Sequence, residues 1–238
     1  MLYRLIRGLL AAPVVHLLVR PRVEGLANVP RRGPVILAAN HLSLIDPVLV
    51  STVVARPINY VVKSEFFTGT GPRGRATGAF FRGIHQLPVD RSGGAASAAA
   101  LTAAEQLLAA GEAFGIFPEG TRSPDGLLHR GRTGVARIAL ATGAPIVPVG
   151  LVGTDRVLAP RSSRIRLYRP TLRFGSPLVF PPEPGADRER LYAVTDEVMA
   201  AIAAMSGQQR DARDARDARD ARDARDARHT PDGPGGAG

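Results

Sequence analysis

The amino-acid sequence predicts an α/β layered domain with a mostly parallel central sheet flanked by helices. Short apolar runs alternate with longer helix-like stretches over residues 23–205, and this alternation is typical of a largely parallel sheet. Several of the short runs are apolar throughout, as strands covered on both faces are. The chain has 238 residues, 45% of them hydrophobic, which is enough for one substantial core and an extra segment at an end.

The predicted elements follow one another along this body. The strands are the short apolar runs, at Val35–Ala39, Ile58–Val62, His85–Val89, Phe114–Phe117, Ile146–Leu151, and one or two between Ile165 and Leu178. The helices are the longer stretches, at Pro47–Ala55, Ala95–Ala110, Thr133–Ala141 and Arg188–Met205. The stretch 68–77 is rich in glycine and arginine and predicts a loop or a flexible flap.

Residues 1–22 predict an amphipathic helix or short hairpin lying in a membrane interface. Apolar residues recur on one helix face, at Leu2, Leu5, Ile6, Leu9 and Leu10. The uncharged run from Gly8 to Val19 is shorter than the about 20 residues that span a bilayer core, and Pro13 would bend it. The alternative is an N-terminal helix packed on the protein's own core. A signal peptide is disfavoured because no small-residue cleavage site follows the apolar stretch.

Residues 206–238 predict a low-complexity tail. Arg-Asp-Ala is repeated six times from Arg210 to Ala227, and a Gly- and Pro-rich end follows. Like charges recur at i+3 and aspartate is a poor residue inside a helix, so we expect a frayed helix or disorder. Because the repeat is nearly charge-balanced, the net charge of +10 belongs to the body.

The composition excludes several kinds of chemistry. There is no cysteine, so disulfides, thiolate catalysis and cysteine-based zinc sites are absent. Lys63 is the only lysine, so nearly all the positive charge is arginine, which suits bidentate contact with phosphate or carboxylate. Such a surface fits anionic lipid, a phosphorylated substrate or nucleic acid. An arginine-rich genome would give the same bias.

A histidine and an aspartate follow the first predicted strand, as His41 and Asp46. A histidine oriented by a carboxylate is a general base at neutral pH. Five residues turn about 500° around a helix, so the two side chains meet only if the segment turns. Asp46 precedes Pro47, which predicts a turn over residues 40–45 and a helix with Asp46 as its N-cap. The alternative is that Asp46 is only a cap and His41 only a loop residue.

Three further runs also end in notable residues. Phe117 and Pro118 lead into Glu119, Gly120, Thr121 and Arg122, and Leu87-Pro88-Val89 leads to Asp90-Arg91. The fourth run, Pro145–Leu151, contains Pro148, which suggests an edge or irregular strand. Each could be an ordinary turn or core strand. If the strands share one sheet, however, a base, an acid and two arginines converge on one rim.

The four runs together resemble the ordered sequence blocks of the glycerolipid acyltransferases, most closely the 1-acylglycerol-3-phosphate acyltransferases. The blocks are NHLSLID, LPVDR, FPEGTRS and IVPVGL, within residues 23–180. The resemblance implies a glycerol-3-phosphate acyltransferase-like fold over residues 23–205. It also implies an enzyme of phospholipid biosynthesis at the cytoplasmic face of the cell membrane, peripheral or monotopic.

The resemblance implies a role for each block. His41 removes the proton of a glycerol hydroxyl and Asp46 orients it. Arg91, Glu119, Gly120, Thr121 and Arg122 hold the phosphorylated acceptor, and Val147 and Pro148 lie in the acyl-donor region. The donor is acyl-CoA or acyl carrier protein, no acyl-enzyme forms, and neither a metal nor another cofactor is implied.

Two alternatives remain open at this point. The acceptor can be another lysophospholipid or a glycolipid, since residues 68–83 are unusually rich in glycine and arginine. In a different class, the chain can be a non-catalytic module that binds anionic lipid through its basic surface. Nucleic-acid binding is not expected, because the chain has few aromatic residues and charge binding requires neither His41 nor Glu119.

Overall fold

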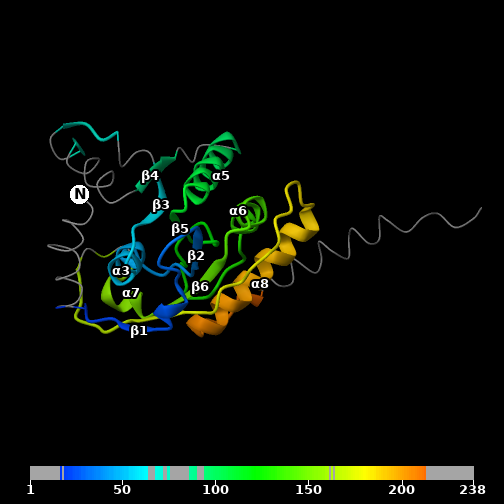
Figure 1. Cartoon of the computed structure of the whole chain (residues 1–238). Coiled ribbons are helices and arrows are strands. Elements are labelled where there is room, and N and C mark those ends of the chain that lie inside the picture. The colour runs from blue at the N-terminus through cyan, green and yellow to red at the C-terminus, as the bar shows by residue number, and fades with distance from the viewer. Residues whose placement is uncertain are drawn as a thin grey trace, which may run out of the picture.

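The computed structural model describes residues 17, 19–63, 68–71, 74–75, 86–89, 94–160, 162 and 164–212. Within these residues lies a mixed sheet of seven strands (Figure 1). The strands are β1 (Arg22–Glu24), β2 (Val35–Ala39), β3 (Ile58–Lys63), β4 (Gln86–Val89), β5 (Ala113–Ile116), β6 (Ile146–Val152) and β7 (Thr171–Phe174).

The strand order is β1-β7-β6-β2-β5-β3-β4. Every neighbouring pair is parallel except β6 and β7, which run antiparallel. The five strands from β6 to β4 therefore point the same way, and their carboxyl ends lie along one edge. The prediction of an α/β fold with a mostly parallel sheet is confirmed.

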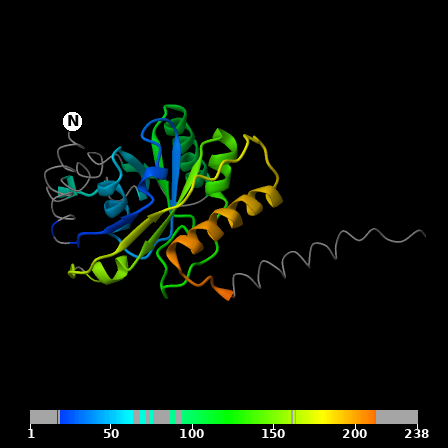
Figure 2. The same ribbon diagram turned by 60° about the horizontal axis from the view of Figure 1, so that its bottom comes forward.

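Helices cover both faces of the sheet. They are α3 (Asp46–Val53), α5 (Gly94–Ala109), α6 (Gly134–Thr142), the short α7 (Thr154–Val157) and α8 (Arg188–Ser206), with a 3₁₀ turn η3 at Leu26–Asn28. Helices α5, α6 and α8 contribute to the core on one face, and α3 and α7 to the core on the other (Figure 1). Figure 2 shows α8 lying along its face, where it packs mainly on β6.

Strand β2 shows why this sequence forms a central strand. All five of its residues are buried, and they alternate between the two cores. Ile36 and Ala38 belong to the core under α6 and α8, whereas Val35, Leu37 and Ala39 belong to the core under α3. This period of two is the strand's own geometry. An uninterrupted apolar run is therefore required here, and the sequence supplies one.

The predicted helices and strands agree with the structure to within a residue or two. The sequence missed β1, which has two charged residues in three, and the four-residue α7. The suggestion of an edge strand at Pro148 was wrong, because β6 lies between β2 and β7. The proline is tolerated because β7 ends at Phe174, opposite this part of β6. The next residue, Gly175, leaves room for the ring of Pro148, since a Cβ at Gly175 would lie 2.8 Å from Pro148 Cγ.

The two terminal predictions fall mostly outside the described residues. Residues 1–16 and 213–238 are not described, so the interfacial helix and the repeat tail stay predictions. The first residues after α8 are described, and they pack on the body. Leu128 donates to Gln209 O and accepts from Asp211 N, which forms a short parallel bridge. In the described part of the chain, no helix is long and apolar enough to cross a bilayer.

Candidate active site

Two neighbouring strands deliver the first and third sequence blocks to the same edge of the sheet. Strands β2 and β5 are parallel and paired, with Ala38 opposite Ile116. The turn after β2 carries His41, and the turn after β5 carries Glu119. The two turns are joined directly, because Ser123 N donates to His41 O at 2.8 Å. The site thus lies at the carboxyl ends of parallel strands, where α/β sheets commonly bind ligands.

The turn at residues 41–46 wraps around a single buried carboxylate oxygen. Asp46 is 0% exposed, and its Oδ2 lies 2.9 Å from His41 Nδ1. The same oxygen accepts from Leu42 N at 2.8 Å and Ser43 N at 2.7 Å. Asp46 was expected to be the N-cap of the next helix. That expectation is wrong, because Asp46 is the first residue of α3 and its side chain bonds the turn that precedes the helix.

The ring of His41 is held by Asp46 and by the ring of Phe117. It stacks on Phe117, with ring centroids 4.0 Å apart and planes 19° apart, and Phe117 stacks in turn on Tyr60. Gly115 makes room for this stack, because a Cβ there would lie 2.2 Å from the Tyr60 ring. With the Nδ1 hydrogen donated to Asp46, the lone pair of the histidine is on Nε2. The side chain is 16% exposed, so solvent or substrate can reach it.

Glu119 ties the two turns together. It is 4% exposed, and its Oε1 and Oε2 accept from His41 N and His129 N, both at 3.1 Å. Burial raises the pKa of this carboxyl above its ordinary value, and the two amide hydrogen bonds oppose the rise. A carboxylate on the turn after β5 therefore positions the backbone of the histidine on the turn after β2.

The three residues after Glu119 form the open side of the turn. Gly120 has φ of +73°, and a Cβ there would lie 2.8 Å from Arg132 Nε. Thr121 is exposed and Arg122 half-buried. Among the described residues, none bonds or pairs with the Arg122 side chain, which leaves its guanidinium available to an anion. Arg132 is a site residue that the sequence did not indicate, since no motif marks it.

Asn40 is a second residue that the sequence did not single out, although it stands beside His41. It is 0% exposed, and it bonds both backbone groups of Leu151 in β6, at 2.9 Å and 2.7 Å. Its amide also donates to Gln208 Oε1 at 2.6 Å. Ser43 Oγ donates to Leu158 O at 2.7 Å, next to α7. The turn that carries His41 is therefore anchored to β6, to the residue after α7 and to the segment after α8.

The remaining site predictions have mixed outcomes. His41, Asp46, Glu119, Gly120, Thr121 and Arg122 come together at one edge. Arg91 lies outside the described residues, so its contact with the site stays a prediction. Val147 and Pro148 are buried inside the sheet, where they pair with Leu37 and Ala38. Their role toward the donor also stays a prediction.

One group of described side chains has ligand atoms close enough to surround a cation. In this group His129 Nε2 lies 2.9 Å from Asp125 Oδ1, and Nδ1 lies 3.5 Å from Asp211 Oδ2. The pKa of exposed Asp125 is lowered, first by the Leu127 amide and then by His129. Both ring nitrogens of His129 therefore face a carboxylate.

The fold and the site together define a class, the α/β proteins that hold an oriented histidine at the carboxyl edge of a parallel sheet. The model of the Acyltransferase family matches residues 20–152, and the chain belongs to that family.

Known relatives agree with this membership. The chain is 30% identical over 133 residues to a 1-acyl-sn-glycerol-3-phosphate acyltransferase of Borreliella burgdorferi, and 31% identical over 134 residues to one of Bacillus subtilis. These matches cover 56% of this chain and 51% and 62% of the relatives, so the chain spans only part of their length. Among solved structures, the 1-acyl-sn-glycerophosphate acyltransferase PlsC of Thermotoga maritima matches with a TM-score of 0.60 and 29% identity, over 75% of this chain and 68% of that one.

Proposed function

We propose that this protein transfers an acyl group from a thioester donor to the free hydroxyl of 1-acylglycerol-3-phosphate, giving phosphatidate for phospholipid biosynthesis. The observation that carries the proposal is the hydrogen bond of 2.9 Å between His41 Nδ1 and Asp46 Oδ2 in a turn that belongs to the Acyltransferase match. The relatives named for this activity support the choice of acceptor.

The reaction follows from the orientation of the histidine. Nε2 of His41 takes the hydroxyl proton as the oxygen attacks the thioester carbonyl. Asp46 stabilises the imidazolium that forms. When the tetrahedral intermediate collapses, the carbon–sulfur bond breaks and the imidazolium returns the proton to the thiolate. The acyl group passes directly from donor to acceptor, in keeping with a chain that has no cysteine. The donor is acyl-CoA or acyl carrier protein.

The acceptor phosphate is proposed to bind the open turn after β5. Arg122 is half-buried, and its side chain has no bond or ion pair with any described residue. Arg91, Gly120 and Thr121 are included on the family resemblance. Glu119 acts here by holding the turn, because both of its oxygens accept backbone amides.

An acyl-transfer assay tests the proposal. His41→Ala should lower turnover by about 10²- to 10⁴-fold, the usual contribution of a general base. Arg122→Ala should mainly raise the KM for lysophosphatidate, by about tenfold, because it removes a charge-assisted hydrogen bond. Arg190→Ala is the control, since that arginine pairs with Glu183 on the surface of α8. Wild type that transfers no acyl group to any lysophospholipid, with His41→Ala indistinguishable from it, would refute the proposal and favour a lipid-binding module.

The choice of acceptor needs its own comparison. Lysophosphatidate is offered beside lysophospholipids with larger head groups and a glycolipid. A preference for lysophosphatidate that Arg122→Ala abolishes supports phosphate recognition. A preference for a larger head group or a sugar would keep the chemistry and replace the acceptor.

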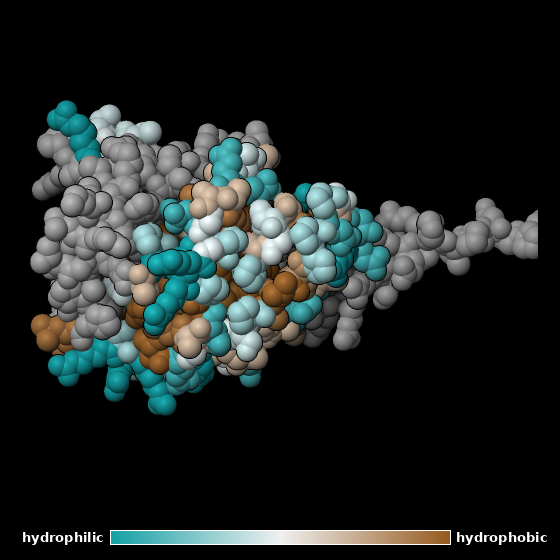
Figure 3. Space-filling view, in the orientation of Figure 1, coloured by the Kyte–Doolittle hydropathy of each residue, from teal (hydrophilic) through white to brown (hydrophobic). Residues whose placement is uncertain are grey.

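We also propose a membrane lipid surface as partner, at the cytoplasmic face of the cell membrane. The exposed large apolar side chains of the described residues include Leu44 at 60%, Ile165 at 57% and Leu167 at 79%. Leu44 belongs to the catalytic turn. Figure 3 shows apolar surface bordering hydrophilic surface at the lower left, where Figure 1 draws the segment after α7. Exposed Arg164 and Arg166 alternate with the apolar pair, which suits an anionic interface.

Vesicle flotation tests this partner. Wild type should float with vesicles containing anionic lipid and less with neutral ones, and the difference should shrink in high salt. Leu167→Ser should weaken flotation, whereas Val179→Ser, which changes an equally exposed residue elsewhere, should not. Deletion of residues 1–20 should weaken it further. Flotation that survives all of these changes would contradict the proposed surface.

A further inference from the structure

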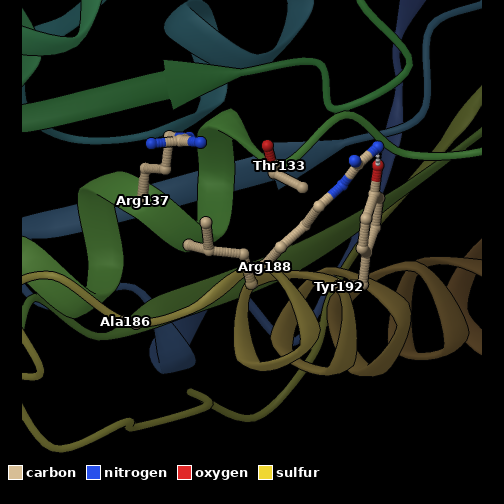
Figure 4. Close-up of a pocket in the computed structure, with 6 residues that line it drawn as sticks. Thr133, Arg137, Ala186, Arg188 and Tyr192 are labelled. Carbon is tan, nitrogen blue, oxygen red and sulfur yellow. Dashed lines mark hydrogen bonds between the residues drawn. The ribbon is translucent and has the colours of Figure 1, made fainter. Parts of the chain in front are cut away.

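A basic recess lies between α6 and α8, apart from the His41 turn. A cavity of about 440 Å³ is lined by Thr133, Arg137, Ala186, Arg188, Leu191 and Tyr192. A second hollow of about 300 Å³ shares Thr133 and Tyr192 and adds Arg130, Gly131 and Arg132. The two form one recess that we call the α6–α8 recess. Figure 4 shows the guanidinium groups of Arg137 and Arg188 on either side of Thr133.

The described lining of this recess is positively charged. Among the described residues that line it, four are arginines and none is acidic. In the described part of the chain, neither Arg132 nor Arg137 forms an ion pair. Arg188 donates to Tyr192 OH, at 3.2 Å, and lies over the ring of that tyrosine. Cations gathered in a recess repel one another, and an anion relieves that repulsion. Arginines with free donors favour phosphate as that anion.

The chain segment that follows the turn after β5 links the candidate active site to the recess. Glu119 bonds the amides of His41 and His129, and the chain then enters the recess at Arg130. Arg132 N donates to Pro118 O at 2.8 Å, and its side chain lies against Gly120. The turn after β5 therefore has one end at the histidine and the other at the recess.

The position of the recess matches the donor rather than the acceptor. In lysophosphatidate only a few bonds separate the free hydroxyl from the phosphate, so that phosphate must lie close to His41. Arg122, next to the turn, suits it. In a coenzyme A thioester the pantetheine arm separates the reacting carbonyl from the nucleotide. Its phosphates must therefore bind well away from the base, and no residue of the His41 turn is among the described residues that line the recess.

Resting on the acyl transfer proposed above, we propose that the α6–α8 recess binds the phosphorylated nucleotide of a coenzyme A thioester. A cavity of about 440 Å³ has the size of a small-molecule site. A carrier protein would instead need a broad contact surface of roughly 800 Å² per partner. The recess therefore selects coenzyme A from the two donors that the family resemblance leaves open.

Direct binding tests the recess without catalysis. Adenosine 3′,5′-bisphosphate, which carries two of the three phosphates of the coenzyme A nucleotide and no acyl group, is titrated into wild type by calorimetry. The double variant Arg137→Ala/Arg188→Ala should bind it about ten- to a hundredfold more weakly, because two charge-assisted contacts are lost. Arg190→Ala, on the same helix but paired with Glu183, should bind as wild type does. Failure of wild type to bind, or equal binding by the double variant, overturns the proposal.

Kinetics then separate the two possible donors. In the double variant, the KM for acyl-CoA should rise by a similar factor, whereas turnover at saturating acyl-CoA should not change. Transfer from an acyl-pantetheine should not change either, because that donor lacks the nucleotide. A larger loss with acyl carrier protein than with acyl-CoA would assign the surface to the carrier and overturn the proposal. If the wild type transfers no acyl group from any donor, the proposed function fails, whereas the binding result still decides the recess.

Discussion

The turn after β2 and the turn after β5 each bury a carboxylate, yet the two carboxylates do different work. Asp46 gathers three donors on one oxygen, and all three come from within five residues of it. Glu119 receives one amide on each oxygen, from residues 78 and 10 positions away. The first carboxylate shapes a local turn and orients a ring. The second one joins segments that are distant in sequence.

This difference predicts that Asp46 acts mainly on the reactivity of the histidine and Glu119 mainly on the stability of the fold. A change at Asp46 should alter the histidine while leaving the fold nearly intact. A change at Glu119 should loosen the fold and affect the histidine only through its backbone. Variants at the two positions therefore test whether the division holds.

The largest effect is expected for Asp46→Asn. The asparagine oxygen can still accept the amides of Leu42 and Ser43, but a neutral amide does not stabilise an imidazolium. Turnover should fall by about 10²- to 10⁴-fold with the melting temperature nearly unchanged. Asp196→Asn, an exposed aspartate on α8, is the control. A variant that unfolds but keeps its turnover when folded would reverse the assignment.

The next effect is expected for Glu119→Ala, and mainly in stability. Two buried amides, of His41 and His129, lose their acceptors, which costs about 2–4 kcal/mol of unfolding free energy. The melting temperature should drop by about 5–15 °C. Glu183→Ala, on a surface ion pair, should change it little. Wild-type stability in Glu119→Ala would show that the two turns hold together without this carboxylate.

A smaller effect is expected at Gly120, where a matched control exists. Gly120 and Gly126 both have positive φ, of +73° and +84°, but only at Gly120 would a Cβ approach a neighbour, Arg132 Nε at 2.8 Å. Each alanine variant should cost about 1–2 kcal/mol of backbone strain in urea unfolding. Gly120→Ala should additionally displace Arg132 and raise the KM for lysophosphatidate, whose phosphate is proposed to bind this turn. Identical kinetics in the two variants would show that Arg132 does not contribute to the site.

The smallest effect is a pH dependence of stability. Burial raises the pKa of Glu119, so the folded state holds this proton more tightly than the unfolded chain does. Its contribution to stability is fully present below the unfolded pKa and is lost as pH rises through the folded pKa. Unfolding free energies of wild type minus Glu119→Gln should therefore decrease as pH increases across that window. A difference that grows with pH would mean that the two amide bonds outweigh burial.

Some parts of this protein could be predicted from sequence because their causes are local. Strand β2 was located to the residue, since a run of apolar side chains between polar segments permits little else. The His41–Asp46 contact was also accessible, because a five-residue turn brings the two groups together whatever surrounds it. The prediction that Asp46 is a helix N-cap was wrong, because the histidine ring and two loop amides bind its carboxylate instead. The preference of aspartate for N-cap positions does not take such competing donors into account.

Other parts could not be predicted because their partners are far apart in sequence. Asn40 bonds Leu151 and Gln208, which lie 111 and 168 positions away. Arg132 follows the third sequence block at a distance that no motif records, and only the fold brings it against Gly120. The α6–α8 recess likewise combines arginines from two helices that are separated by two strands in the chain order.

The sequence by itself determined the α/β class, the order of the strands and helices in the chain, and the turn that pairs His41 with Asp46. Each of these follows from apolar periodicity or from bonds that span a few residues. Only the tertiary structure decided that Glu119 holds the catalytic turn, that Pro148 lies inside the sheet, and that four arginines share one recess. Those outcomes depend on strand order and helix packing, which arise from contacts that no local pattern encodes.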